Sequence, residues 1–270
     1  FVIATGKADR LLRARKFEDA LSAYVDASIG KEVTSLQKSE ALYQAAHCAR
    51  ALKDSDRASE LASQIPLEFV AKTTQMENLL DLRQWTAIVE QFGNEDFDDW
   101  PFWQVAAGAR ARGRAYHALN EGEKAEADLQ RAIELTADSR TRLSIGRIFG
   151  ENYETVLKDD EAALVAYRQM IKLAGSNNGS AEYFYCIQGA ARILTRQRKF
   201  DEALDVLSLT PAERLSGTWR PSMQLSRAEV LTAASRLEPA LKAIQAVIDD
   251  PDATKSHRSR AADLKIEVTK

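Results

Sequence analysis

A short phrase recurs along most of this chain, and it constrains the fold more than any other feature. The phrase is a turn residue, an aromatic or apolar residue, two polar residues and then alanine. It reads Lys16-Phe17-Glu18-Asp19-Ala20-Leu21 near the start and Lys199-Phe200-Asp201-Glu202-Ala203-Leu204 near the end. Self-similarity at a near-constant interval is typical of repeat architectures, in which each unit buries its apolar face against its neighbours.

Weaker copies of the phrase extend the pattern through the chain. The key alanines are at positions 20, 58, 125, 163, 203 and 240, so the successive intervals are 38, 67, 38, 40 and 37 residues. The long interval has room for one degenerate unit, and Arg83-Gln84-Trp85-Thr86-Ala87-Ile88 supplies a matching turn there. The sequence therefore predicts about seven units.

The residues that flank each phrase have helical spacing. Before the phrase at 199–204 come Ala190, Ala191 and Leu194, and after its turn come Ala203 and Leu207. Residues spaced by three or four positions lie on one face of a helix. Only 12 Gly and 6 Pro interrupt the 270 residues, and no alternating run of β-branched residues predicts a sheet. We therefore expect an all-α chain of antiparallel helix pairs, with small residues where two helices cross.

The clearest unit, Gly113-Arg114-Ala115-Tyr116 followed by Ala125, Leu129 and Ala132, is similar to the tetratricopeptide repeat at nearly every signature position. That resemblance covers almost the whole chain and implies a right-handed α-solenoid of helix-turn-helix units. Most intervals here exceed the usual period of about 34 residues, and the proline that usually ends a repeat is largely absent. Several helices or connections are therefore expected to be long.

The repeat pattern divides the chain into four segments. Residues 1–92 hold about three repeats, of which the third is degenerate, and residues 105–250 hold about four. Residues 93–104 form an acidic and aromatic connection, whose Trp and Phe side chains lie either beneath an irregular loop or on a docking surface. Residues 251–270 are expected to form a capping helix with a polar outer face.

The family resemblance implies that the first helix of each hairpin lines a concave groove. The side chains expected on that face are Tyr43, His47, Arg50, Arg110, Arg114, His117, Arg147, Tyr185, Gln188, Arg192 and Arg196. A groove with several guanidinium groups would suit a carboxylate, a phosphate or an acidic peptide.

The sequence leaves a second interpretation of these arginines open. They are either solvated or paired with Glu151, Glu154 and Glu229 on the same face. The carboxylate clamp of some family members is not expected, because Ile148 and Gly189 stand where polar side chains would be needed.

The inventory of chemically reactive residues predicts neither an enzyme nor a metal or cofactor site. His47, His117 and His257 lack metal-ligand spacing, no nucleotide-binding or nucleophile motif occurs, and Cys48 and Cys186 have no CxxC context. A net charge of −3 gives no general attraction to nucleic acid. No apolar run is long enough for a transmembrane segment.

These observations predict a non-catalytic scaffold or adaptor that binds a protein or peptide, and an acidic partner would suit the arginines. Two alternatives stay open: a ligand-sensing regulatory domain attached to another domain, and a structural spacer in a bacterial envelope assembly. The chain begins at Phe1, so an upstream segment is expected to have been removed, and both a cytoplasmic and an exported location are open. The sequence predicts no oligomeric state.

Overall fold

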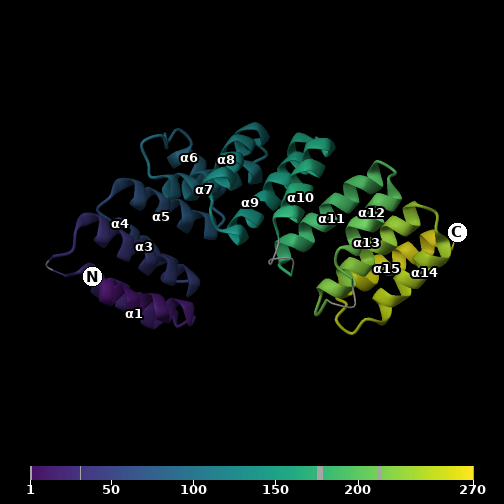
Figure 1. Ribbon diagram of the computed structural model, residues 1–270, viewed down its shortest axis with the longest axis horizontal. Coiled ribbons are helices and arrows are strands. Elements are labelled where there is room, and N and C mark those ends of the chain that lie inside the picture. The colour runs from purple at the N-terminus through teal and green to yellow at the C-terminus, as the bar shows by residue number, and fades with distance from the viewer. Residues whose placement is uncertain (1, 31, 175–178, 212–214, 270) are drawn as a thin grey trace. The chain divides into compact units, whose positions relative to one another are not determined.

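A computed structural model describes residues 2–30, 32–174, 179–211 and 215–269, and within these ranges the regular structure is entirely helical (Figure 1). The chain forms two compact units, which we call unit 1 (residues 1–136) and unit 2 (residues 137–270). The helices of unit 1 are α1 (Val2–Arg13), α2 (Phe17–Ser28), α3 (Ser35–Ala51), α4 (Ser55–Ser63), α5 (Glu68–Asp81), α6 (Trp85–Phe92), α7 (Phe102–Ala118) and α8 (Gly122–Leu135). Those of unit 2 are α9 (Ser139–Asn152), the π-helical turn η1 (Tyr153–Leu157), α10 (Asp160–Leu173), α11 (Ala181–Arg196), α12 (Phe200–Ser208), α13 (Trp219–Ala233), α14 (Leu237–Asp249) and α15 (Lys255–Val268).

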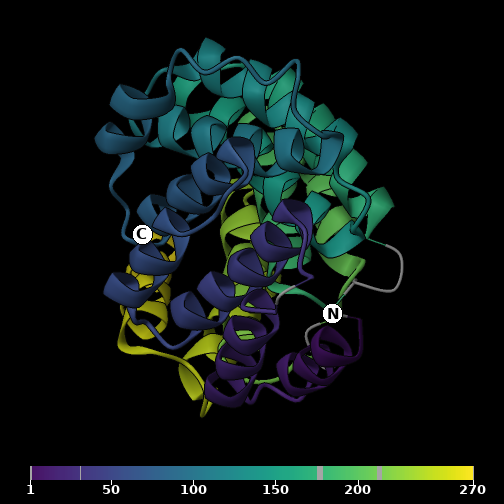
Figure 2. The ribbon, with the colours of Figure 1, turned by 90° about the vertical axis from the view of Figure 1, so that its left-hand side faces the viewer.

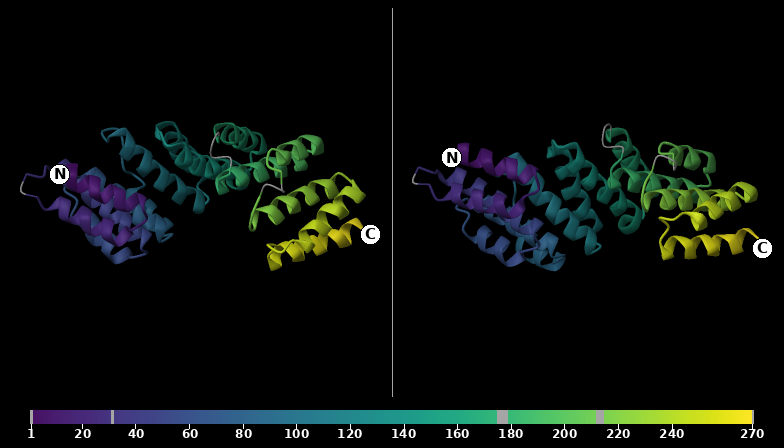
Figure 3. Two further views of the ribbon diagram at one scale, coloured as in Figure 1. Left: turned by 60° about the horizontal axis from the view of Figure 1, so that its bottom comes forward. Right: turned by 90° about the horizontal axis from the view of Figure 1, so that it is seen from below.

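Successive helices pair into seven hairpins, as the sequence predicts. Each odd-numbered helix from α1 to α13 packs on the helix that follows it. The first helices also pack on one another within a unit: α3 on α5 and α5 on α7 in unit 1, and α9 on α11 and α11 on α13 in unit 2. Figure 2 brings the first hairpins of unit 1 to the front, and Figure 3 shows α13, α14 and α15 side by side in unit 2.

Every hairpin turn contains one non-glycine residue in the left-handed region. These residues are Arg15, Lys53, Arg83, Asn120, Lys158, Arg198 and Ser235, with φ between 55° and 63°. In six turns the following N–H donates to the carbonyl five residues earlier, for example Lys16 to Leu11 at 3.0 Å. This bond ends the first helix by satisfying one of its free carbonyl groups.

The fifth turn differs because η1 adds one residue to the last turn of the first helix. The N–H of Asp159 there donates to the carbonyl of Tyr153, six residues earlier, at 2.9 Å. No sequence pattern predicted this π-helical turn, which displaces the residues before Lys158 relative to the other repeats.

The six predicted alanines lie where two helices cross. Ala20, Ala58, Ala125, Ala163, Ala203 and Ala240 are all completely buried. The degenerate third unit has its predicted turn, but its register is one residue later than the sequence match. Ile88 occupies the crossing position and is completely buried, whereas Ala87 is only partly buried.

The aromatic side chains of the acidic and aromatic connection before α7 differ in burial, and only the first interpretation, a plug beneath the loop, is observed. Phe97 is buried and its ring lies 4.8 Å from that of Trp100, so these two residues fill the space beneath the loop. Phe102 and Trp103, in the first turn of α7, are 63% and 43% exposed. The connection lies inside unit 1.

Arg112 of α7 holds this connection in place, a role that no sequence motif predicted. Its guanidinium forms a bidentate pair with Asp128 of α8 at 2.7 and 2.9 Å and donates to the carbonyl of Glu95 at 2.7 Å. The same group lies 4.3 Å from the centre of the Phe97 ring. One partly buried cation therefore joins two helices and a loop.

The boundary between the compact units, at residues 136 and 137, falls within the predicted segment 105–250. It lies between the α7–α8 hairpin and the α9–α10 hairpin. The segment 251–270 contains α15, which packs on α13 and α14 through the buried side chains Ala261 and Leu264.

Candidate functional site

The eleven predicted binding residues lie on first helices of the hairpins and fall into two groups. We call them the unit 1 face and the unit 2 face. The unit 1 face consists of Tyr43, His47 and Arg50 on α3 and Arg110, Arg114 and His117 on α7. The unit 2 face consists of Arg147 on α9 and Tyr185, Gln188, Arg192 and Arg196 on α11.

The unit 1 face is organised around a carboxylate that sequence reasoning missed. Glu77 of α5 lies between α3 and α7, and its side chain is only 7% exposed. Arg50 Nη2 donates to Glu77 Oε2 at 2.7 Å, Arg110 forms an ion pair with Glu77 Oε1, and the Tyr43 hydroxyl approaches the same oxygen at 3.5 Å. Three predicted residues therefore converge on one internal anion.

Arg50 makes two further polar contacts, one of them with a second carboxylate. It donates to Asn78 Oδ1 at 3.2 Å and lies 3.3 Å from Asp81.

The negative charge of Glu77 and burial raise the pKa of Tyr43. Desolvation and the nearby Arg50 lower the pKa of His47, so its imidazole is neutral at pH 7.

Arg114 and His117 lie further along α7, and both are partly buried. Arg114 is one helical turn from Arg110, as the four-residue spacing predicts.

The unit 2 face is organised around Glu154, a residue of η1 whose side chain is 5% exposed. Arg192 binds both carboxylate oxygens at 2.7 Å, Arg196 donates to Oε1 at 3.0 Å, and the Tyr167 hydroxyl donates to Oε2 at 3.0 Å. Burial alone would raise the pKa of Glu154, but these hydrogen bonds outweigh it and hold the pKa below its ordinary value of 4.5.

The remaining charges of the unit 2 face are also paired. Arg196 binds Asp160 through two nitrogens at 2.6 and 3.0 Å, and Arg147 forms an ion pair with Glu151 one turn later on α9. The expected pairing with Glu151 and Glu154 is therefore present. Glu229 instead pairs with Arg260 at 2.9 Å, so its expected pairing with a face arginine is wrong.

Tyr185 is the predicted residue with the most accessible apolar surface, at 47% exposed. Its ring packs edge-on against Trp219 at 5.2 Å, and the Arg147 guanidinium lies 5.2 Å from the ring centre. Gln188, one turn away, donates to the hydroxyl oxygens of Ser222 and Ser226 at 2.9 and 3.0 Å. Contacts to α13 therefore fix the position of this part of α11.

The two cysteines lie in the core of the described structure. Cys48 and Cys186 are buried free thiols, and burial raises their pKa values to about 11 and about 12, which leaves little thiolate at pH 7. Within the described ranges, no three His, Cys, Asp or Glu side chains gather to hold a metal ion. Among the same residues, no helix is both long and apolar enough to cross a membrane.

Comparison with solved structures identifies the arrangement of the hairpins. The C-terminal part of a TPR repeat-containing protein from Cytophaga hutchinsonii matches 95% of this chain and 98% of its own, with a TM-score of 0.56 and 12% identity. The chain has the tetratricopeptide-repeat fold. A tetratricopeptide repeat protein from Parabacteroides merdae covers 99% of this chain and 98% of its own, with a TM-score of 0.48 and 11% identity. No protein-family model and no curated protein sequence matches the chain.

Most helical repeats of this chain are longer than is usual for the tetratricopeptide-repeat fold, as the sequence predicts. Their left-handed turn residues are 38, 30, 37, 38, 40 and 37 residues apart, against a usual period of about 34. The short interval runs from Lys53 to Arg83 and contains α4 and α5, which have 9 and 14 residues.

Proposed function

We propose that this protein is a non-catalytic interaction module that binds a polypeptide partner on the first-helix faces of its tetratricopeptide repeats. The observation that carries the proposal is the unit 2 face, where the exposed Tyr185 ring is held between Trp219 and Arg147. Tyrosine and arginine on a rigid support are the residues that most often dominate binding energy at protein interfaces.

The charge arrangement defines the kind of partner that suits this face. Arg147, Arg192 and Arg196 are each paired with an internal carboxylate, so the face is not an open cationic groove. A carboxylate of the partner would have to replace an internal one. This favours a partner with mixed polar and apolar side chains over a uniformly acidic one.

The positions of Glu77 and Glu154 decide which variants can test the proposal. Replacing Arg110 and Arg192 by glutamate would place a second carboxylate beside each of these buried anions. Loss of binding in that variant could then result from unfolding, because like charges in a buried site are strongly destabilising.

A photo-crosslinking amino acid at position 185 tests the face without changing its charges. The matched control has the same amino acid at position 165, because Val165 on α10 of the same unit is also exposed, at 54%. We expect position 185 to crosslink a discrete polypeptide from extracts of the source organism, and position 165 to give none. Equal crosslinking at both positions, or none at either, would contradict binding at the unit 2 face.

A further inference from the structure

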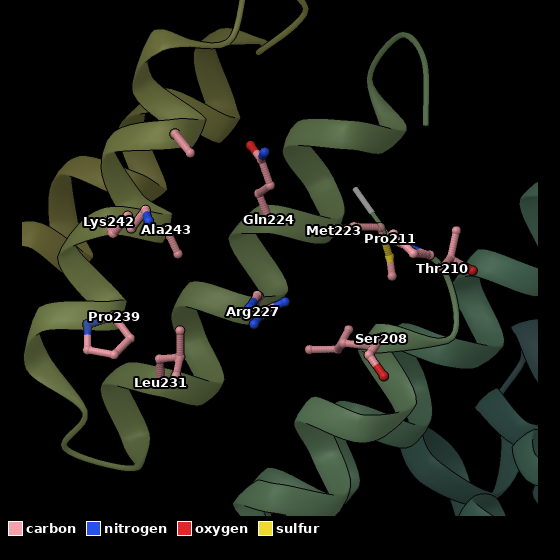
Figure 4. Close-up of a pocket in the computed structure, with 12 residues that line it drawn as sticks. Ser208, Thr210, Pro211, Met223, Gln224, Arg227, Leu231, Pro239, Lys242 and Ala243 are labelled. Carbon is pink, nitrogen blue, oxygen red and sulfur yellow. The ribbon is translucent and has the colours of Figure 1, made fainter. Parts of the chain in front are cut away.

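Unit 2 contains a pocket of about 570 Å³ on residues that are not part of the unit 2 face. It lies between α12 and α14, which both pack on α13, and Figure 4 shows its lining residues on these helices and on the segment after α12. Leu207, Met223 and Leu231 form buried apolar walls. Pockets that hold small molecules typically have volumes of about 300–1,000 Å³ and mostly apolar linings.

Two cations line this apolar pocket. Arg227 of α13 and Lys242 of α14 are both exposed side chains. Within the described residues neither of them forms an ion pair, in contrast to the paired arginines of the unit 2 face. The pocket therefore combines apolar surface with two cations that pair with no carboxylate of the described residues, and this combination is complementary to an amphipathic anion.

Gln224 of α13 adds a third requirement for a ligand. Its side-chain oxygen Oε1 is buried and accepts no hydrogen bond from any described residue. A buried acceptor without a donor is costly, and a ligand that supplies an N–H or O–H group would remove that cost.

We propose that this pocket binds an apolar carboxylic acid that also carries one hydrogen-bond donor, such as an N-acylated aliphatic amino acid. The aliphatic group lies against Leu207, Met223 and Leu231, the carboxylate binds Arg227 and Lys242, and the N–H donates to Gln224. The last residue of a polypeptide presents the same three groups as a free N-acylated amino acid. The proposal therefore assigns the three groups that the ligand must carry. The experiment below distinguishes a free N-acylated amino acid from the C-terminal residue of a polypeptide.

Three small probes dissect this recognition, with binding to the full chain followed by ligand-observed NMR. N-acetyl-leucine carries all three groups, N-acetyl-leucinamide lacks the carboxylate, and 4-methylpentanoate lacks the donor. We expect N-acetyl-leucine to bind about tenfold more tightly than the amide, because hydrogen bonds to charged groups are among the strongest in proteins. It should also bind more tightly than 4-methylpentanoate. A pentapeptide that ends in leucine is the fourth probe.

Pocket variants show where the probes bind. The double variant Arg227→Gln/Lys242→Gln should weaken N-acetyl-leucine binding about tenfold or more, and Ala243→Phe should block the pocket without changing a charge. Lys172→Gln on α10 is the control, because it removes an exposed charge of the same unit outside the pocket. Helical circular dichroism and the melting temperature establish that each variant is folded.

Each result decides between support and rejection. Binding of the peptide with the affinity of N-acetyl-leucine would assign a chain terminus as the ligand, and binding of N-acetyl-leucine alone would assign a free small molecule. The proposal is overturned if no acid binds at millimolar concentration, if the amide binds as well as the acid, or if the folded pocket variants bind like the control. Crosslinking at position 185 is independent of all these outcomes.

Discussion

At the scale of single residues, Tyr167 shows how tightly the hairpins of unit 2 pack. Its ring is 1% exposed and lies between two glycines of neighbouring first helices, Gly150 of α9 and Gly189 of α11. A Cβ atom at either glycine would be 2.5 Å from an edge carbon of the ring. The Tyr167 hydroxyl donates a hydrogen bond to Glu154, and the ring is in close contact with a first helix on each side. The ring therefore cannot move away from an added methyl group without losing one of these contacts.

Gly189→Ala should therefore lower the free energy of unfolding by about 2–3 kcal/mol, the cost of overpacking a tight core. Gly6→Ala in α1 is the matched control, because it adds the same methyl group within a helix where nothing lies within 4 Å. That control should be neutral or stabilising by up to about 1 kcal/mol. Urea unfolding of both variants measures the difference. Equal stabilities would contradict the close contact between Gly189 and the Tyr167 ring.

Glu154 makes the stability of unit 2 depend on pH in the acid range. Because the folded state lowers the pKa of Glu154 below 4.5, ionised Glu154 stabilises the fold above that pH. The contribution is lost as the pH falls through the lowered pKa. Glu154→Gln should cost about 2 kcal/mol at pH 7, since hydrogen bonds to two arginines are weakened.

The difference in unfolding free energy between the wild type and Glu154→Gln should shrink as the pH is lowered below 4.5. Urea titrations at a series of pH values measure it. Asp205→Asn on α12 serves as the control, because this exposed carboxylate forms no ion pair among the described residues. A difference that stays constant down to the acid transition would rule out Glu154 as the titrating group.

The candidate site was only partly predictable from its residues. Helical spacing correctly placed Arg192 and Arg196 on one face of α11, because that inference needs only the geometry of one helix. Their common partner, Glu154, lies 38 residues from Arg192, and its position depends on how two hairpins stack and on η1. The role of Glu77 between α3 and α7 was missed for the same reason.

At the scale of elements, the hairpin turns place ordinary L-residues in the left-handed region. Asn120 is the only one of the seven described turn residues that tolerates this conformation well, while Lys53 and Arg198 are strained there. A search for glycine at helix ends would have missed these turns. The phrase after each turn indicated the turn positions better, because its alanine is the small residue that the crossing of two helices requires.

Lys53→Gly should raise the stability of the protein by about 0.5–1 kcal/mol, since glycine adopts positive φ without steric cost. Lys53→Ala removes the same side chain but keeps the strain, so it should stay within about 0.5 kcal/mol of the wild type. The melting temperatures of the two variants give the comparison. A glycine variant no more stable than the alanine variant would argue against the left-handed turn.

The third hairpin shows why register could not be read from sequence alone. Ala87 continues the alanine pattern of the other repeats, but the short α6 begins at Trp85 and places Ile88 at the crossing. Moving the crossing position by one residue in a helix of eight residues hardly changes the helix propensity of the segment. The tertiary contact of Ile88 therefore decides the register.

At the scale of the whole molecule, the chain divides into two compact units with separate hydrophobic clusters. In a repeat protein each hairpin is stabilised by its neighbours, so a destabilising substitution is expected to weaken mainly the hairpins next to it. Ala203, completely buried in unit 2, and Ala125, completely buried in unit 1, allow a reciprocal test.

Ala203→Arg should accelerate hydrogen exchange in α10–α13 and leave α1–α6 protected, because a long charged side chain has no space at the α11–α12 crossing. Ala125→Arg should produce the opposite pattern, with α5–α8 losing protection. Hydrogen exchange followed by mass spectrometry reports both at the level of single helices. If either variant deprotects both units equally, the chain unfolds as one cooperative body.

The pairing of the face arginines also has a kinetic consequence. Opposite charges separated by less than 4 Å cancel at longer range, so a partner approaching either face would experience little electrostatic steering. Encounter rates on the order of 10⁵–10⁶ M⁻¹ s⁻¹ are expected for such unsteered association. These rates should change little between dilute and physiological salt, and discrimination among partners would arise after contact, from how slowly the correct one leaves.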